Sequence, residues 1–169
     1  MDSIEKVPEI GFKEITSENA DVLAQLRLEI NHDKAPEDLQ AEAEMYASNP
    51  GMKAYISVED SVPTGYIELL AEDNELHSDA PEINTENLAH IARIAVAEEH
   101  RNKGIGKALL AQAEQWAIEQ GKEGVWLDYL ADNEGARKLY ESAGYKDVAE
   151  FVDTKKKQKQ RRIAVKRFQ

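Results

Sequence analysis

Two glycines and three cationic side chains lie within seven consecutive residues and could together bind an anion. Gly104 and Gly106 are separated by one residue, and Arg101, Lys103 and Lys107 surround them. A strand-like run precedes this segment and a helix-like pattern follows it, so the first N–H groups of the helix lack intrahelical partners and carry the positive end of its dipole. Such a turn binds phosphates. The glycine spacing alone is equally compatible with a tight turn that binds nothing.

Other phosphate-binding loops fit this segment poorly. A P-loop needs Gly-x-x-x-x-Gly-Lys-Ser/Thr, but the first glycine is missing and Ala108 follows Lys107. A dinucleotide fingerprint needs a third glycine, and the chain has Leu109 at that position. The remaining pattern is Arg-x-x-Gly-x-Gly directly after a long strand.

A second motif lies further along the chain, from Asp132 to Tyr145, and reads DNEGARKLYESAGY. Taken with the first motif, it closely resembles the GNAT superfamily of N-acetyltransferases, which use acetyl-CoA. The resemblance covers roughly residues 88–148, and the expected order of elements extends it over nearly the whole chain.

The resemblance implies roles for particular residues. The Arg101–Lys107 turn would wrap the coenzyme A pyrophosphate, and the strand before it would pair with the pantetheine arm. Asn133 would contact the cofactor, and Tyr140 would stand near the thioester sulfur. The implied cofactor-binding residues are Ile94, Ala95, Val96, Arg101, Asn102, Lys103, Gly104, Ile105, Gly106, Lys107, Asn133, Ala136 and Tyr140.

Acetyl transfer to an amine needs few catalytic groups. The ammonium form, with a pKa of about 10.4, must lose a proton before it attacks the thioester. The oxyanion that forms needs a fixed donor, which the resemblance assigns to the backbone N–H of Val96. Tyr140 could protonate the leaving thiolate, although its place in an apolar helix stripe also suits a core aromatic.

Three side chains are candidates for the general base. His90 is the first choice, because imidazole exchanges protons near neutral pH and His90 lies on the strand before the turn. Glu68 and Asp128, on the preceding and following strands, are alternatives that could instead bind the acceptor's ammonium. Alternatively, His90 has a structural role and the two strand carboxylates face solvent, in which case none of the three is the base.

Acidic residues gather in the segments expected to shape the acceptor pocket. They would attract a cationic amine, whether a small molecule or a protein amine, although acidic helices are also ordinary solvated faces. They are Glu29, Asp33, Glu37, Asp38, Glu42, Glu44, Glu72, Asp73 and Glu75.

Composition narrows the function classes further. A formal net charge of −12 argues against nucleic-acid binding, and no apolar run approaches the roughly 18 residues needed to span a membrane. The chain has no cysteine, and its four histidines show no metal-binding spacing, so we expect no metal. The N-terminus lacks a secretion signal, which predicts a cytoplasmic protein. The basic run 155–162 reads as a solvated turn, with an RNA contact as the alternative.

Apolar periodicity predicts an α/β (α+β) fold in one domain, residues 1–169, with residues 1–8 as a flexible terminus. About six or seven strands and four helices follow the order βααβββαβαββ. The last strand, with Val165 and Phe168, is a plausible edge for homodimer pairing. A non-catalytic acyl-CoA sensor remains the alternative function. The predicted elements span residues 10–15, 16–30, 36–47, 53–58, 65–70, 88–96, 104–120, 125–130, 133–143, 145–152 and 163–168, with a long surface loop at 72–86.

Overall fold

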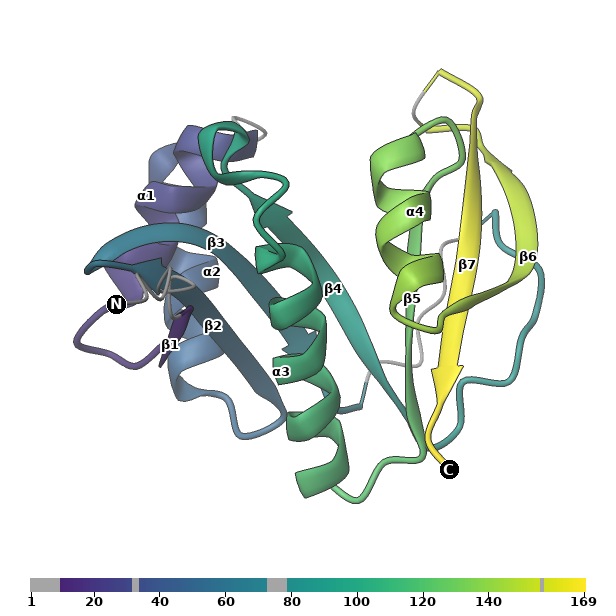
Figure 1. Ribbon diagram of the computed structural model, residues 1–169, viewed down its shortest axis with the longest axis horizontal. Helices are drawn as coiled ribbons and strands as arrows, with labels where there is room; N and C mark the ends of the chain where they lie inside the picture. The colour runs from purple at the N-terminus through teal and green to yellow at the C-terminus, as the bar shows by residue number, and fades with distance from the viewer. Residues whose placement is uncertain (1–9, 32–33, 73–78, 156) are drawn as a thin grey trace, which may run out of the picture. The chain divides into compact units, whose positions relative to one another are not determined.

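The elements of the chain follow the predicted order (Figure 1). The computed structural model describes residues 10–31, 34–72, 79–155 and 157–169. A short 3-10 helix, η1, was not predicted; it lies directly before the Arg101 turn. The elements are β1 (Gly11–Glu14), α1 (Ala20–Asn31), α2 (Pro36–Ser48), β2 (Met52–Glu59), β3 (Val62–Leu70), β4 (Leu88–Val96), η1 (Glu98–His100), α3 (Ile105–Glu119), β5 (Gly124–Leu130), α4 (Glu134–Ser142), β6 (Lys146–Asp153) and β7 (Lys159–Arg167).

The strands form one sheet in the order β1-β2-β3-β4-β5-β7-β6. β4 and β5 are parallel, as the crossover through α3 requires, whereas β7 pairs antiparallel with β5 and with β6. The mixed sheet confirms the predicted fold class. The prediction that β7 is an edge strand is wrong, because β7 lies between β5 and β6. Ile163 and Ala164, which point to opposite faces, are both 1% exposed, as expected of an interior strand.

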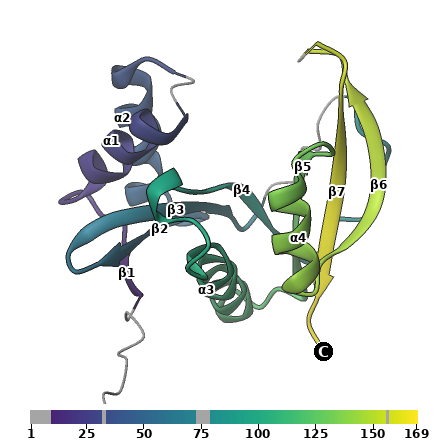
Figure 2. The same ribbon diagram turned by 45° about the horizontal axis from the view of Figure 1, so that its top comes forward.

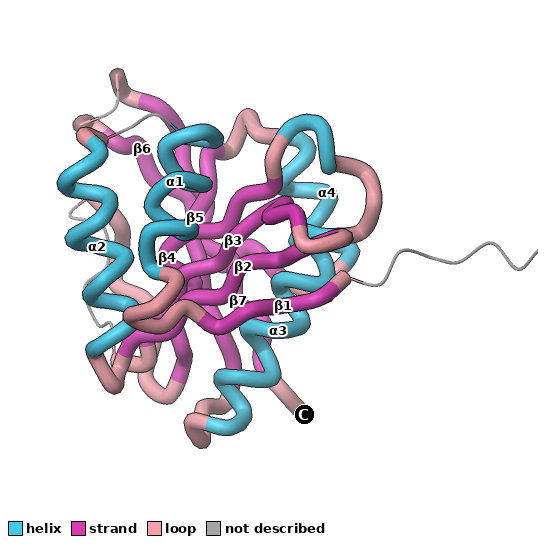
Figure 3. Tube along the Cα trace, turned by 90° about the vertical axis from the view of Figure 1, so that its left-hand side faces the viewer, coloured by secondary structure: helices cyan, strands magenta, loops and turns pink. Residues whose placement is uncertain are grey.

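The chain divides into two compact parts, which we describe separately. The first part comprises the residues up to Glu68 together with Arg93–Leu109. Within it α1 packs against α2, and α2 against β2 (Figure 3). Its core is mainly apolar, because the buried stripes of the two helices face buried strand residues. The core includes Leu23, Leu26, Leu39, Ala43, Tyr46, Ile56, Tyr66 and Ile67.

The second part comprises Leu69–Ala92 and Leu110–Gln169. In it α4 lies beside β5 and β7 (Figure 2). A cluster of Leu88, Trp126, Phe151 and Ile163 forms part of its core, and Ala80 and Ile83 pack against this cluster. The predicted surface loop 72–86 is therefore partly packed where the structure describes it. The β4–β5 ladder pairs residues 88–90 of β4 with residues 124–126 of β5.

Two predicted turns are shorter than expected. The β2–β3 hairpin turns at Asp60 and Ser61, both with positive φ, instead of over six residues. In the described part of the basic run, only Lys155, Lys157 and Gln158 lie in a turn, since β7 begins at Lys159 and includes Arg161 and Arg162. The description of the whole run as a solvated turn is therefore wrong for its second half.

The structure does not test the predictions of a flexible N-terminus and a single domain. Residues 1–9 lie outside the described residues, and a single domain over residues 1–169 stays a prediction. No helix within the described ranges is long and apolar enough to cross a membrane.

Candidate active site

The turn between β4 and α3 is open to solvent. Arg101, Asn102, Lys103 and Gly104 are all exposed, and the chain enters α3 at the buried Ile105. Gly104 has φ +83°, a conformation that side chains with a Cβ rarely adopt. Nothing lies within 4 Å of the place where a Cβ on Gly104 would sit. The backbone is thus bare at this point and leaves room for a ligand.

Backbone N–H groups at the start of α3 lack partners within the helix. The first helical bond runs from the Ala108 N–H to the Gly104 carbonyl, at 3.1 Å. The N–H groups of Ile105, Gly106 and Lys107 therefore precede the helical hydrogen-bond ladder. Gly104 precedes the helix and has no side chain to cap them. A diphosphate fits this chemistry, because it offers several anionic acceptors to uncapped donors.

The three cations of the turn are not equivalent. Arg101 donates from Nε to the Val96 carbonyl at 3.2 Å, which ties the turn back to the end of β4. The Lys103 ammonium lies 3.6 Å from a Glu59 carboxylate oxygen and is partly neutralised. Among the described residues, Arg101 and the exposed Lys107 form no ion pair, so they supply most of the free positive charge.

The end of β4 is held close to β3. Ala97 donates its N–H to the Thr64 carbonyl at 2.9 Å. A Cβ on Gly65 would come within 2.8 Å of the Ala95 carbonyl, so only glycine allows this approach. Ile94, Ala95 and Val96 are each partly exposed. The stretch assigned to the pantetheine arm is therefore rigidly placed and still accessible.

Glu68 lies in a buried cluster of charges. It is 2% exposed, and Arg27 Nη1 and Arg93 Nε lie 3.4 Å and 3.6 Å from its two carboxylate oxygens. Arg27, itself 1% exposed, also donates to Glu42 at 2.9 Å. Burial raises the pKa of Glu68 to about 7, against the opposing effect of the two arginines. Glu68 does not face solvent, and its pKa is suited to a general base near neutral pH.

Arg27 and Arg93 were missed in the sequence. Arg27 is one helical turn beyond Leu23 and directly follows Leu26, so it interrupts the apolar face of α1. A charged residue in such a stripe usually has a buried partner, and Glu68 interrupts the apolar run of β3 in the same way. These two charged residues within apolar patterns, Arg27 on α1 and Glu68 on β3, were the sequence signal that could have revealed the buried cluster.

The second motif places Asn133 and Ala136 at the start of α4. Asn133 precedes the helix, and its side-chain oxygen accepts the N–H of Ala136 at 3.0 Å. Both residues predicted to bind cofactor therefore take part in a helix cap. The amide nitrogen of the exposed Asn133 takes no part in this cap, and the cofactor contact of Asn133 stays a prediction.

Tyr140 is buried on the inner face of α4. Its ring meets Tyr129 edge-on, with centroids 5.2 Å apart, so it does contribute to the core. Burial, followed by the nearby Tyr129 and Asp128, raises the pKa of Tyr140 to about 12. The phenol therefore stays protonated at physiological pH and can donate a hydrogen bond.

The other two base candidates have structural partners. His90 stacks on Trp126 with ring centroids 3.8 Å apart and planes 7° from parallel. Asp128 accepts from Arg161 at 2.7 Å, so it does not face solvent as a free carboxylate. Both candidates therefore take part in contacts that hold the structure together, Asp128 in an ion pair and His90 in a stacked ring pair.

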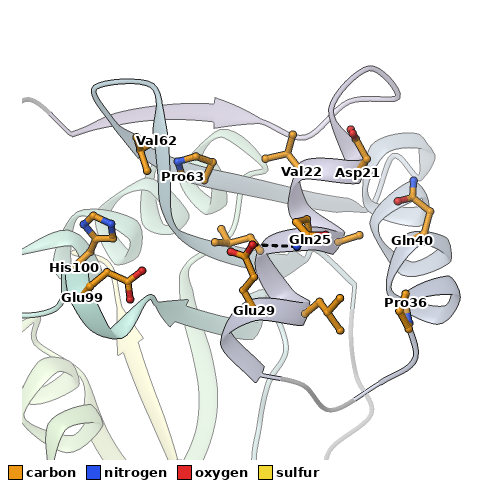
Figure 4. A pocket seen from close by; sticks show the side chains of 13 residues that line it. Asp21, Val22, Gln25, Glu29, Pro36, Gln40, Val62, Pro63, Glu99 and His100 are labelled. Atoms are coloured by element: carbon orange, nitrogen blue, oxygen red, sulfur yellow. Dashed lines mark hydrogen bonds between the residues drawn. The ribbon is translucent and has the colours of Figure 1, made fainter.

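A cavity of about 590 Å³ opens in the first part, between α1, the start of α2, the β2–β3 turn and η1. Glu99 and His100 line one side of it, and Glu29, which accepts from Gln25 at 3.0 Å, lines another (Figure 4). Asp21 also lines it. Among the described residues the three carboxylates have no cationic partner, which leaves this cavity negative.

Most of the predicted acidic rim lies elsewhere. Only Glu29 of that set lines the cavity. Glu42 pairs with Arg27 and Lys34, and Glu72 pairs with Lys122. Asp33, Asp73 and Glu75 lie outside the described residues.

The described chain offers no ready metal site, since no group of three or more potential ligands comes together in it. The basic run is also less available than its sequence suggests. Arg161 pairs with Asp128, Arg162 with Asp147 and Glu150, and Lys159 with Asp132. These pairs weaken the case for an RNA contact.

The sequence of residues 20–145 matches the acetyltransferase (GNAT) family. The chain belongs to this family. The match includes both motifs and all the elements from α1 to α4, so the resemblance seen in the sequence is confirmed.

Individual relatives share part of their length with this chain. An uncharacterised N-acetyltransferase from the pepI 3' region of Lactobacillus delbrueckii subsp. lactis is 30% identical over 62% of this chain and 58% of its own length. The streptothricin acetyltransferase of Escherichia coli is 33% identical over 57% of this chain and 56% of its own length. In four such relatives, the matched part spans 21% to 58% of the relative's length.

A solved structure extends the likeness to the fold. It is a putative streptothricin acetyltransferase from Bacillus anthracis str. Ames in complex with acetyl coenzyme A. It is 27% identical, with a TM-score of 0.62, over 73% of this chain and 67% of its own.

Proposed function

We propose that the chain is an N-acetyltransferase that transfers the acetyl group of acetyl-CoA to a primary amine. The observation that carries this proposal is the bare, uncapped start of α3 beside Arg101 and Lys107. Family membership and the acetyl-CoA bound to a relative's structure support it. The Arg101–Lys107 turn would hold the diphosphate, and residues 94–96 of β4 would bind the pantetheine arm.

The reaction proceeds directly within a ternary complex. The neutral amine attacks the thioester carbonyl, the C–S bond breaks as the amide forms, and the amine's proton goes to a base. Glu68 is the base best supported by geometry, because Arg93, its 3.6 Å neighbour, directly precedes Ile94. Its pKa of about 7 also suits the task. The Val96 N–H would stabilise the oxyanion.

His90 is the second candidate for the base. It lies on β4, and its stacking on Trp126 fixes the plane of the ring. Substitution separates the two candidates. Replacing the true base by a residue of similar shape that cannot accept the proton should lower the rate of acetyl transfer without weakening cofactor binding, whereas the same change at the other candidate should not.

Tyr140 would assist the leaving thiolate by donating a hydrogen bond. Its pKa of about 12 lies well above the value of about 8.5 typical of a thiol, so complete proton transfer is unfavourable. A fixed donor still lowers the energy of the developing sulfur anion. The thiolate then takes its proton from water.

The acceptor would be a cationic amine, either a small molecule or a protein amine. The carboxylates Asp21, Glu29 and Glu99 around the cavity support this, since they attract cations and have no cationic partner in the part of the chain that the structure describes. A relative's action on streptothricin is compatible with it. A cytoplasmic location and a homodimer stay predictions, and β7 is not available as an exposed edge.

A non-catalytic acyl-CoA sensor is the alternative, because the Arg101–Gly106 turn would serve it equally well. Release of free thiol from acetyl-CoA, measured with a panel of amines, separates the two. We expect amine-dependent release, slowed by Tyr140→Phe and by Glu68→Gln with little change in acetyl-CoA affinity. Binding of acetyl-CoA with no release for any amine would favour the sensor.

A further inference from the structure

We propose that Arg27 is a positioning residue, which holds the Glu68 carboxylate in its ionised, proton-accepting form with help from Arg93. This rests on the proposed function, since Glu68 is there the base. Arg27 lies on α1 and takes no part in either sequence motif.

Arg27 joins three elements of the first part through one guanidinium group. Its Nη1 lies 2.9 Å from Glu42 Oε2 on α2 and 3.4 Å from Glu68 Oε2 on β3. A cation that is 1% exposed costs much free energy unless it is paired, so this charge is retained in the interior by its two carboxylates. The same pairing fixes the position of Glu68 relative to α1 and α2.

The contact with Glu68 supplies charge but no hydrogen bond. Glu68 Oε2 is buried and has no hydrogen-bond partner among the described residues. Arg27 therefore favours the carboxylate form electrostatically, while the oxygen keeps a lone pair for an incoming proton. A residue that only stabilised the fold would be expected to satisfy this oxygen.

The charge state of Glu68 depends on a balance. Burial opposes the carboxylate, whereas Arg27 and then Arg93 favour it. Among the described residues, the charged and titratable groups that act on Glu68 come from α1, α2, the residues before α2 and β4, and they are Arg27, Arg93, Glu42, Lys34 and Tyr46. Burial is already the largest of these effects, so loss of a cation raises the pKa of Glu68 further and leaves less of the base ionised near neutral pH.

Four substitutions test this balance by the sign of their effects. Arg27→Met and Arg93→Gln remove a cation, so the acidic limb of the rate against pH should move to higher pH. The rate should fall by about tenfold or more below the midpoint and recover at high pH. Arg27→Lys keeps a positive charge and should restore much of the loss. Glu42→Gln removes a like charge, so it should move the limb to lower pH.

The experiment measures acetyl transfer from pH 5.5 to 9 at saturating acetyl-CoA and amine. In parallel, the Glu68 side-chain carboxyl is titrated by carbon NMR in each variant, a readout that needs no activity. Arg93 is partly exposed, so Arg93→Gln tests the balance even if Arg27→Met fails to fold.

Two outcomes would overturn the proposal. One is a Glu68 titration midpoint that is the same in the wild type as in Arg93→Gln and Arg27→Met, the two variants that remove a cation. The other is an equal rate loss at every pH for both Arg27 variants, which indicates a structural role alone. If no amine is acetylated, the proposed function fails, but the NMR midpoints still decide whether the arginines set the charge of Glu68.

Discussion

Gly104 is the single residue on which the proposed anion-binding turn depends most. Its φ of +83° directs the backbone into α3, and no atom lies within 4 Å of the place where a Cβ on Gly104 would sit. A side chain here would be strained by its own backbone, since L-residues pay about 1 kcal/mol or more for a left-handed conformation. It would also intrude where the diphosphate is proposed to lie.

Gly104→Ala should therefore lower the free energy of unfolding by about 1 kcal/mol and weaken coenzyme A binding. Gly121→Ala is the matched control, because Gly121 has φ +77° and equally open surroundings but lies at the other end of α3. It should cost similar stability and leave binding unchanged. Gly51→Ala, open and without positive φ, should change neither. Denaturant unfolding and calorimetry measure the two quantities; equal binding in the Gly104 and Gly121 variants would contradict the assignment.

At the scale of elements, α4 is a short helix whose start depends on one side chain. Its nine residues gain a cap from Asn133, which accepts the Ala136 N–H. Caps of this kind contribute about 1 kcal/mol. The resemblance to the family assigns Asn133 to the cofactor as well, so its oxygen and nitrogen can be tested separately.

Asn133→Ala should destabilise the protein by about 1 kcal/mol, whereas Asn133→Asp keeps the capping oxygen and should preserve stability. If the amide nitrogen donates to the cofactor, both variants should bind acetyl-CoA more weakly. Thermal unfolding together with acetyl-CoA titration distinguishes the roles. Unchanged affinity in Asn133→Asp would leave Asn133 as a cap alone.

Most elements were predictable because their apolar spacing is regular. β4 was predicted at its observed bounds, since a nearly unbroken apolar run is typical of an interior strand. The position of β7 was not predictable, because strand order depends on non-local pairing. The start of β7 at Lys159 was hidden by basic residues that are neutralised only by acids distant in the sequence, such as Asp128.

The candidate site was predictable only where a local motif carries it. Gly104 was singled out by the glycine spacing, whereas Asn133 and Tyr140 were singled out by the family resemblance of the second motif, and their roles stay predictions. The Arg27–Glu68 pair joins residues far apart in the chain, so no short pattern reports it.

At the scale of the whole molecule, a buried base affects stability. The raised pKa of Glu68, about 7 against an ordinary value of 4.5, means that the folded protein binds this proton more tightly than the unfolded chain. The stabilising contribution is complete below about pH 4.5 and is lost as the pH rises through about 7. The ionised form that the proposed mechanism needs is thus the less stable one.

Glu68→Gln cannot titrate and should lack this decline. The free energy of unfolding of the wild type relative to the variant should fall by on the order of 2 kcal/mol between pH 5 and pH 8. Urea unfolding at both pH values measures the difference. A difference that does not change with pH would mean that the environment of Glu68 does not raise its pKa.

The central claim is that the uncapped start of α3 holds a diphosphate, and calorimetric titration with coenzyme A tests it most directly. Pantetheine, which lacks the diphosphate and nucleotide, serves as the comparison ligand. We predict saturable binding of one coenzyme A per chain, weakened by added salt and much tighter than that of pantetheine. Absence of coenzyme A binding at low ionic strength, or equal affinity for the two ligands, would contradict the account.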